Sequence, residues 1–171
     1  HRRAVRREGS GQGGGVDLQR TVGVQVDADG GERPEPRVAL GLALAGVAHA
    51  ALDLSDGLAG DLQHILERSR VRADIDADAV PRSAALATLP PDVQRRCTLA
   101  GGDDYELCFT APAAARAAVE AAGAGAGVAV TRIGTIRALS TPSERPAIAW
   151  RDAAGAPLAL TLHGFDHFHA D

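Results

Sequence analysis

This 171-residue sequence contains no lysine, asparagine or methionine, only two cysteines and few aromatic residues. Without lysine the chain holds no P-loop of the GxxxxGK type, so any nucleotide site must be of another kind. The two cysteines, Cys97 and Cys108, form neither a CxxC pair nor a disulfide framework, and a cytoplasmic location is the simplest expectation. Because all 18 basic residues are arginine, an arginine by itself is weak evidence for a phosphate site.

The formal net charge of −4 gives the chain no overall positive field to attract nucleic acid or an anionic membrane. The apolar run Val38–Leu52 is shorter than the roughly 20 residues that span a bilayer. It also follows an acid-containing stretch too long for the basic region of a signal peptide. With 45% apolar residues the sequence predicts a globular protein that binds neither nucleic acid nor membrane.

Two regions differ in composition. Residues 1–31 are rich in arginine, glycine and aspartate, and we expect an irregular or poorly ordered lead-in there. Within it, apolar and other residues alternate along Thr21–Asp27, as they do in a β-strand. Pairing with another strand would order this segment. Residues 32–171 are expected to form the folded domain.

Helical and strand patterns alternate through that domain. A helix is expected over Arg37–His49 and, because apolar residues surround it, it should be covered on several sides. The strand Ala51–Leu54 should lead into a helix that Ser55 or Asp56 caps and that runs to about Ser69. Leu58, Leu62, Ile65 and Leu66 form the buried stripe of this helix. Further strands are expected at 71–76, 105–110, 128–136, 147–151 and 158–162, and further helices at 83–88, 92–99 and 112–123, with 121–127 as a turn. This order predicts an α/β (α+β) fold, a mixed β-sheet covered by helices.

The first group of acidic residues lies in Asp53-Leu54-Ser55-Asp56-Gly57. On a strand, Asp53 and Ser55 point to one face while Leu54 points into the core. Asp56 follows where strand becomes helix. Carboxylates and a hydroxyl gathered in this way suit a hard cation that retains several waters. The alternative is a capped helix with an incidental strand aspartate.

The second group lies in Gly101-Gly102-Asp103-Asp104-Tyr105-Glu106-Leu107. The glycines permit close approach of the backbone to a ligand, and like charges this close repel unless a cation or a basic group neutralises them. A solvated turn is the alternative interpretation.

Five segments occur in the order seen in thiamine-monophosphate kinase, and the chain resembles that family from about residue 32 to 168. The segments are Arg33–Arg37, Leu52–Leu58 with Asp61–Ile65, Gly101–Phe109, Thr131–Gly134 and Gly164–Phe168. The resemblance implies the fold of the carboxy-terminal domain of the aminoimidazole-ribotide synthetase and selenophosphate synthetase superfamily. It also implies ATP-dependent phosphorylation of thiamine monophosphate to thiamine diphosphate, with Mg²⁺, in thiamine biosynthesis.

Residue roles follow from the same resemblance. Asp53 and Asp56 would bind Mg²⁺, Ser55 would contact ATP, and Asp103 and Phe165 would lie against thiamine monophosphate. Tyr105 and Glu106 would be structural or would support the site from behind. Phe165 has an alternative role as a hydrophobic plug that closes the core. No residue is assigned as catalytic, because direct phosphoryl transfer needs positioning and charge neutralisation rather than a covalent intermediate.

The amino-terminal half of the family supplies further metal-binding acids and nucleotide contacts, and residues 1–31 do not resemble it. We therefore expect this fragment alone not to catalyse, and any homodimer to form through the missing half. Two other interpretations stay open. One is another ATP-using member of the superfamily, of the selenophosphate synthetase or hydrogenase-maturation type. The other is a non-catalytic fragment that binds a ligand or a partner chain.

Overall fold

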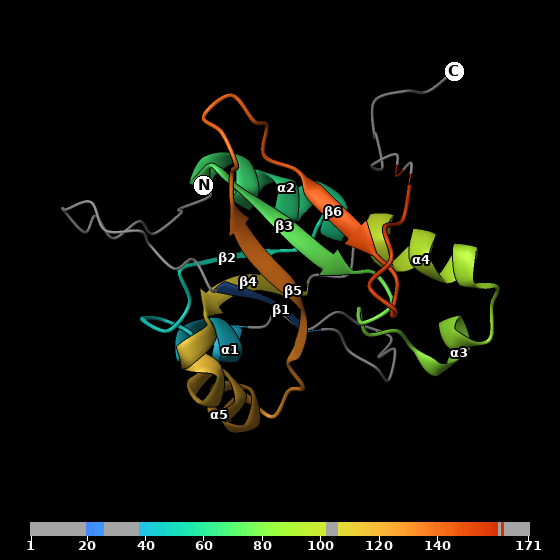
Figure 1. Cartoon of the computed structure of the whole chain (residues 1–171). Coiled ribbons are helices and arrows are strands. Elements are labelled where there is room, and N and C mark those ends of the chain that lie inside the picture. The colour runs from blue at the N-terminus through green and yellow to red at the C-terminus, as the bar shows by residue number, and fades with distance from the viewer. Residues whose placement is uncertain (1–19, 26–37, 102–105, 161, 163–171) are drawn as a thin grey trace, which may run out of the picture.

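A computed structural model describes residues 20–25, 38–101, 106–160 and 162 of the chain. Its centre is a six-stranded sheet in the order β2-β4-β1-β5-β3-β6, shown in Figure 1. Neighbouring strands run antiparallel except for β3 and β6, which are parallel. The strands are β1 (Arg20–Gln25), β2 (Ala50–Asp53), β3 (Val71–Asp76), β4 (Leu107–Pro112), β5 (Thr131–Ala138) and β6 (Ile148–Arg151). The sheet is mixed, as predicted.

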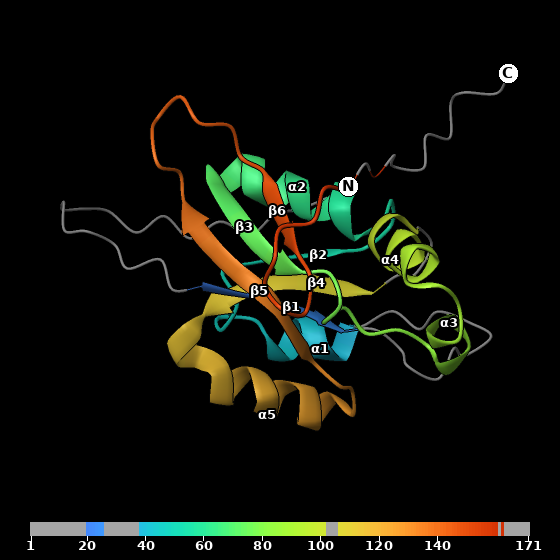
Figure 2. The same ribbon diagram turned by 45° about the vertical axis from the view of Figure 1, so that its right-hand side comes forward.

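Helices cover both faces of this sheet. They are α1 (Val38–Ala43), α2 (Leu58–Ser69), α3 (Ala84–Ala87), α4 (Pro91–Ala100) and α5 (Arg116–Ala126), with a short 3₁₀ turn, η1 (Ala113–Ala115), before α5. Figure 2 shows α2 and α4 on one side of the strands and α1 and α5 on the other. The predicted α/β (α+β) architecture is therefore confirmed. No helix in the described part of the chain has the length and hydropathy needed to cross a membrane.

The larger core cluster lies under α2. The four residues of the predicted stripe, Leu58, Leu62, Ile65 and Leu66, are all buried there. Their spacing of three or four residues places them on one helix face, so the pattern alone determined which side of α2 meets the sheet. Burying four such side chains contributes on the order of 6–12 kcal/mol before conformational entropy is subtracted.

Strand β1 lies inside the region predicted as a lead-in. It occupies the middle of the sheet between β4 and β5, and its Val22 is fully buried. The strand predicted within Thr21–Asp27 is thus confirmed, and this segment belongs to the sheet. The rest of residues 1–31 lies outside the described residues, so the boundary near residue 31 stays a prediction.

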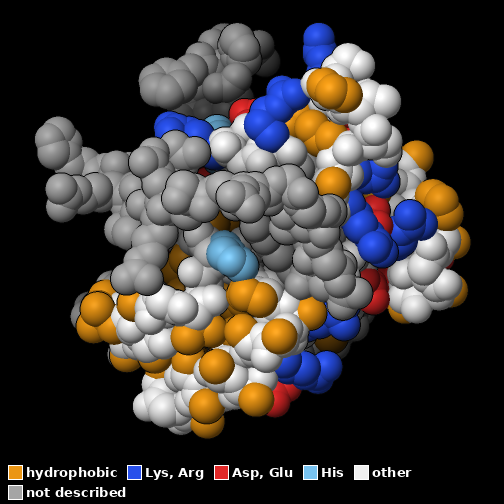
Figure 3. Space-filling view, turned by 60° about the vertical axis from the view of Figure 1, so that its left-hand side comes forward, with side chains coloured by type: hydrophobic (Ala, Val, Ile, Leu, Met, Phe, Trp, Pro, Cys, Tyr) orange, Lys and Arg blue, Asp and Glu red, His pale blue; other side chains and the backbone are white. Residues whose placement is uncertain are grey.

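Helix α1 differs from its prediction, because it ends at Ala43 and is covered on one side only. Leu40 is buried, whereas Val38 is 61% and Leu42 is 72% exposed. The helix packs against α5 and the sheet, and the described residues place nothing over its outer face. Figure 3 shows the hydrophobic side chains gathered on this side of the molecule. Apolar residues all round a helix do not by themselves show what surrounds it.

The last two corrections concern glycine- and proline-containing segments. Residues 121–126 are not a turn but the end of α5, which alanine favours, and the left-handed Gly127 (φ 70°) ends the helix. Residues 158–160 and 162 do not form the predicted strand. The chain instead turns back after β6, where the backbone N–H of Leu158 donates to the Trp150 carbonyl at 2.9 Å. Pro157 lacks an N–H, so this return makes only an isolated bridge with Arg151.

Candidate functional site

The first acidic motif lies at the turn between β2 and α2. Asp53 is the last residue of β2 and is exposed, and the next residue, Leu54, is buried. Ser55 is half-buried and Asp56 is exposed. The predicted alternation of outward and buried side chains is therefore present at the end of β2. The turn carries two carboxylates and a hydroxyl at the edge of the sheet.

Neither Ser55 nor Asp56 caps α2, contrary to our prediction. The N-cap is Gly57, with φ +95°, and no side chain bonds to the cap. Instead, Asp61 in the first turn of the helix reaches back. Its Oδ2 accepts hydrogen bonds from the backbone N–H groups of Ser55 at 2.8 Å and Asp56 at 2.9 Å. The turn is thus held by a side chain from inside the helix.

Asp61 is a site residue whose role the sequence interpretation missed. It is only 3% exposed, and it lies three residues after Leu58 on the core-facing side of α2. A carboxylate there is costly to bury unless it is hydrogen-bonded. The two backbone donors satisfy it, and its position near the positive end of the helix dipole adds to this. An acidic residue within an otherwise apolar stripe was the available signal.

The second acidic motif comes directly beside the first. The backbone N–H of Leu54 donates to the Glu106 carbonyl at 2.7 Å, which extends the pairing of β2 with β4 beyond Asp53. At the end of α4, the Cα of Gly57 packs on the main chain of Gly101, so that a Cβ there would lie 2.9 Å from the Gly101 oxygen. The fold therefore brings together two segments that lie more than 40 residues apart in the sequence.

Asp103, Asp104 and Tyr105 lie outside the described residues, and so does Phe165. The predicted contact of Asp103 and Phe165 with a substrate therefore stays a prediction. Both described ends of the Asp103 loop, Gly101 and Glu106, flank the turn after β2.

The carboxylates of Asp53 and Asp56 have no hydrogen-bond or ion-pair partner among the described residues, and both are exposed. Oxygen donors of this kind suit Mg²⁺, which retains waters and takes few protein ligands. Within the residues that the structure describes, no three His, Cys, Asp or Glu side chains group closely enough to hold a metal ion. Asp53 and Asp56 are therefore two candidate metal ligands, and the described residues supply no third His, Cys, Asp or Glu ligand beside them.

Two further ionisable groups lie behind the turn. Glu106 is 5% exposed, in keeping with the supporting role expected for it. Burial, and to a smaller extent the nearby Asp61 carboxylate, raises the pKa of the Cys108 thiol to about 12. Cys108 is therefore a protonated, unreactive core residue, and nucleophilic chemistry by this cysteine is excluded.

A groove of about 510 Å³ opens next to Asp56, between α2, the end of α4 and β6. A second hollow, of about 370 Å³, is lined by β3, β5 and the turn after β6. There Asp74 pairs with Arg72 (3.5 Å), Arg137 (3.1 Å) and Arg151 (3.8 Å). Asp74 of β3 is therefore charge-balanced by arginines.

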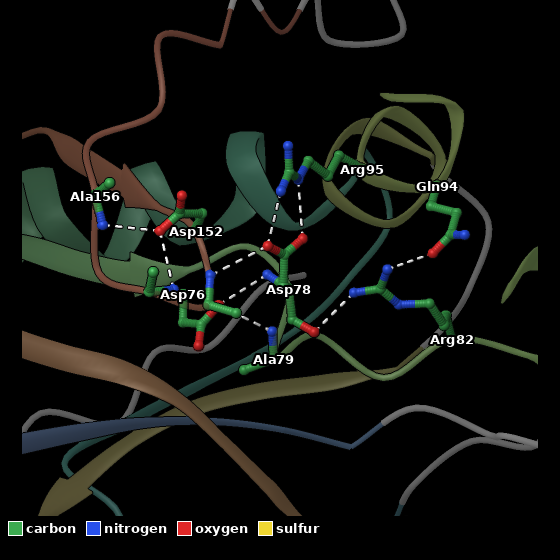
Figure 4. Close-up of polar contacts among 10 residues, drawn as sticks. Asp76, Asp78, Ala79, Arg82, Gln94, Arg95, Asp152 and Ala156 are labelled. Atoms are coloured by element: carbon green, nitrogen blue, oxygen red, sulfur yellow. Dashed lines mark hydrogen bonds and ion pairs between the residues drawn. The ribbon is translucent and has the colours of Figure 1, made fainter. Parts of the chain in front are cut away.

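An ion pair fixes α4, and with it the start of the Gly101 segment. Arg95 of α4 donates to both carboxylate oxygens of Asp78, from Nε at 2.9 Å and from Nη2 at 2.7 Å (Figure 4). The same carboxylate accepts from the backbone N–H of Ala153 at 3.2 Å, in the turn after β6. The hydrogen bonds from Arg95 hold the pKa of Asp78 below its usual value despite partial burial. Asp78 thus joins three elements.

Residues 7–143 match the family described as AIR synthase related protein, C-terminal domain. The chain belongs to this family. The match begins before β1, whereas we expected the resemblance to begin near residue 32.

Curated relatives confirm the resemblance stated above. The chain is 44% identical over 137 residues to the thiamine-monophosphate kinase of Salmonella typhimurium, and 42% identical over 138 residues to that of Haemophilus influenzae. Each match covers 80% of this chain. The chain spans about 40% of the length of these relatives, with 40% and 41% covered.

Solved structures agree on the fold. Thiamine-monophosphate kinase from Stenotrophomonas maltophilia matches with a TM-score of 0.68 and 35% identity, over 83% of this chain and 52% of that one. PurL of T. maritima has 9% identity over 83% of this chain and 24% of its own, yet its TM-score is 0.63. The family fold is therefore retained at low sequence identity.

Proposed function

We propose that this chain is the carboxy-terminal part of a thiamine-monophosphate kinase, which transfers a phosphoryl group from ATP to thiamine monophosphate. The observation that carries the proposal is the 44% identity to a curated thiamine-monophosphate kinase over 137 residues. Any 137-residue stretch of this chain includes both acidic motifs. The contact between Gly57 and Gly101 supports the proposal, because it places the turn that carries Asp53 and Asp56 beside the described start of the second motif.

In this proposal Asp53 and Asp56 hold Mg²⁺, and Ser55 contacts ATP. The residues present fit the ion, since both carboxylates are exposed and without a described partner, and Asp61 fixes the turn that carries Asp56. Mg²⁺ bound there would neutralise charge on the phosphate oxygens. The role of the chain is to position the acids, so no protein nucleophile is needed.

Asp103 and Phe165 are proposed to contact thiamine monophosphate. A carboxylate and an aromatic ring are suitable partners for a cationic thiazolium. A structural relative with 22% identity, which shows the fold alone, is AaThiL complexed with AMPPCP and TMP. A homodimer formed through an amino-terminal half, and a cytoplasmic location, belong to the same proposal.

A chimaera tests the proposal. The matching segment of the Escherichia coli thiamine-monophosphate kinase, 42% identical over 137 residues, is replaced by that of this chain. We expect the chimaera to form thiamine diphosphate from ATP and thiamine monophosphate. The 171-residue chain alone should not turn over, because its relatives are much longer.

The double variant Asp53→Asn, Asp56→Asn in the chimaera should lose activity at ordinary Mg²⁺ concentrations. Asp92→Asn is the matched control, because Asp92 is an exposed acid in the first turn of α4, outside both motifs. A folded chimaera without thiamine diphosphate formation would refute the function. Equal Mg²⁺ dependence of the double variant and the control would remove Asp53 and Asp56 from the metal site.

A further inference from the structure

Helix α4 is held in the fold by one apolar side chain and by a set of polar contacts. Of its ten residues only Leu99 is buried, in the core cluster under α2. A single buried side chain does little to fix the rotation or the axial position of a helix, because apolar contact is not directional. The position of α4 therefore depends on its polar contacts with the rest of the fold.

These polar contacts converge on Asp78, in the turn after β3. Arg95 of α4 donates to both oxygens of the Asp78 carboxylate, at 2.9 and 2.7 Å, so that the orientation of the guanidinium is fixed as well as its distance. Arg82 donates to the Asp78 carbonyl at 2.7 Å and also to the side chain of Gln94 in α4 (Figure 4). Two consecutive residues of α4 are thus tied to one residue of this turn.

The pair of Asp78 and Arg95 is also shielded from solvent. Both side chains are only 23% exposed. Because the pair has two parallel hydrogen bonds and limited exposure, it fixes geometry better than an ordinary surface ion pair. The third donor to the Asp78 carboxylate, the Ala153 N–H at 3.2 Å, adds the turn after β6 to the same cluster.

The end of α4 rests on the turn between β2 and α2. A Cβ on Gly57 would lie 2.9 Å from the Gly101 oxygen and 3.0 Å from the Ala100 Cα, so no space separates the two main chains. Gly57 directly follows Asp56. The turn is therefore held from two sides, by the Asp61 carboxylate from within α2 and by the end of α4 from outside.

We propose that Asp78 and Arg95 are positioning residues for the turn between β2 and α2. The pair fixes α4, the end of α4 fixes the main chain at Gly57, and Gly57 sets the direction in which Asp56 projects. Asp78 and Arg95 thus act through the main chain at Gly101 and not as metal ligands. This inference rests on the proposed function, in which the aspartates of this turn hold Mg²⁺.

Amide hydrogen exchange of the whole 171-residue chain tests the positioning without reference to activity. The reporters are the N–H groups of Ser55 and Asp56, which are hydrogen-bonded within the turn. The reference is the set of slowest-exchanging N–H groups of the sheet, which report global unfolding. In Asp78→Asn, exchange at the two reporters should accelerate about threefold or more beyond the change at the reference, because a loosened α4 frees the turn locally.

Asp74→Asn is the matched control. Asp74 is also an ion-paired aspartate, with a side chain 16% exposed, and its described partners Arg72, Arg137 and Arg151 all lie in the sheet. Its loss should change the reporters and the reference alike.

Arg95→Gln is the second variant, at a partly exposed position of α4, and it should repeat the result of Asp78→Asn because it removes the other half of the pair. Equal acceleration of reporters and reference in both pair variants would overturn the inference, since the pair would then contribute only to global stability. Unchanged exchange at the reporters would overturn it as well.

The chimaera supplies a second readout. With ATP and thiamine monophosphate saturating, Asp78→Asn should raise the Mg²⁺ concentration for half-maximal rate by about threefold or more, whereas Asp74→Asn should leave it unchanged. An unchanged Mg²⁺ requirement in Asp78→Asn would overturn the inference. If exchange responds as expected while the chimaera forms no thiamine diphosphate, the function fails and the positioning of the turn stands.

Discussion

Gly57 and Gly101 lie in direct contact, and this contact joins the two acidic motifs. A Cβ on Gly57 would lie 2.9 Å from the Gly101 oxygen and 2.9 Å from the Ala100 carbonyl carbon, both of which are backbone atoms that cannot swing away. Gly57 also adopts φ +95°, a conformation that disfavours any residue with a Cβ. Glycine at position 57 therefore serves both the turn and the approach of α4.

Gly57→Ala should lower the free energy of unfolding by about 1–3 kcal/mol, from strain and from the clash with Ala100 and Gly101. Urea denaturation measures this change. Gly60→Ala, three residues further along, is the control. There an added Cβ would contact only the Cβ of Asp56, at 4.0 Å, and alanine favours the helix over glycine by up to about 1 kcal/mol. Equal stability of the two variants would show that the Gly57 contact is unimportant.

Asp61→Ala should destabilise the protein by about 1–3 kcal/mol, because the N–H groups of Ser55 and Asp56 lose their acceptor. Asp61→Asn keeps an acceptor oxygen and should cost less. In the chimaera, both variants should raise the Mg²⁺ requirement by loosening the turn that carries Asp56. An Asp61→Ala variant with wild-type stability would contradict the assigned role.

Leu40 and Leu42 on α1 should respond differently to the same substitution. Leu40→Ala opens a cavity and should cost about 2–5 kcal/mol. Leu42, which is 72% exposed, should change stability by no more than about 0.5 kcal/mol when replaced by alanine. Thermal unfolding of the two variants compares them directly, and a large loss in Leu42→Ala would mean that its side chain is covered.

The two cysteines should differ in reactivity. Cys97 is exposed, whereas Cys108 is buried and its pKa is raised to about 12. Titration of the native protein with a thiol reagent near pH 8 should modify one thiol per chain, and titration in denaturant should modify two. Cys97→Ser should leave no thiol that reacts rapidly in the native state. Rapid labelling of that variant would show that Cys108 is accessible.

Acid should weaken the Asp78–Arg95 pair. The pKa of Asp78 is lowered in the folded state, chiefly by its hydrogen bonds with Arg95, so the carboxylate stabilises the fold at pH values above the unfolded pKa near 3.8. That contribution is lost as the pH falls through the lower, folded-state pKa. Asp78→Asn should therefore reduce stability at neutral pH and flatten its dependence on pH below about 4. Urea denaturation from pH 7 to 2.5 measures both effects. A variant profile parallel to that of the wild type would refute this coupling.

Local patterns predicted the elements that depend on local chemistry. The stripe of α2 follows from helical periodicity, and its burial was predictable because all four residues share one helix face. The acidic motifs were recognisable because acids beside glycines are unusual at the edge of apolar runs. Their spacing did not show that Gly57 touches Gly101, since that contact depends on where α4 ends.

Errors arose where burial or pairing depends on distant segments. The apolar residues of α1 suggested cover on several sides, but Val38 and Leu42 on its outer face are exposed. The N-cap of α2 predicted at Ser55 or Asp56 was wrong, because the N-cap is Gly57 and the Asp61 carboxylate accepts from the backbone N–H groups of the turn. The place of Asp61 within the apolar stripe marked it as unusual, but the sequence around it does not show that its carboxylate accepts from the N–H groups of Ser55 and Asp56.

The sequence by itself determined the type of most helices and strands, the inward face of α2 and the two acidic motifs, because each follows from side-chain periodicity and conformational preference. Only the tertiary structure decided that β1 occupies the centre of the sheet, that the motifs meet, and that a groove opens beside Asp56. Pairing of β1 with β4 and β5 joins residues about 80 to 116 positions apart. Such pairings are selected by the total burial and hydrogen bonding of the whole sheet, which no local window of sequence contains.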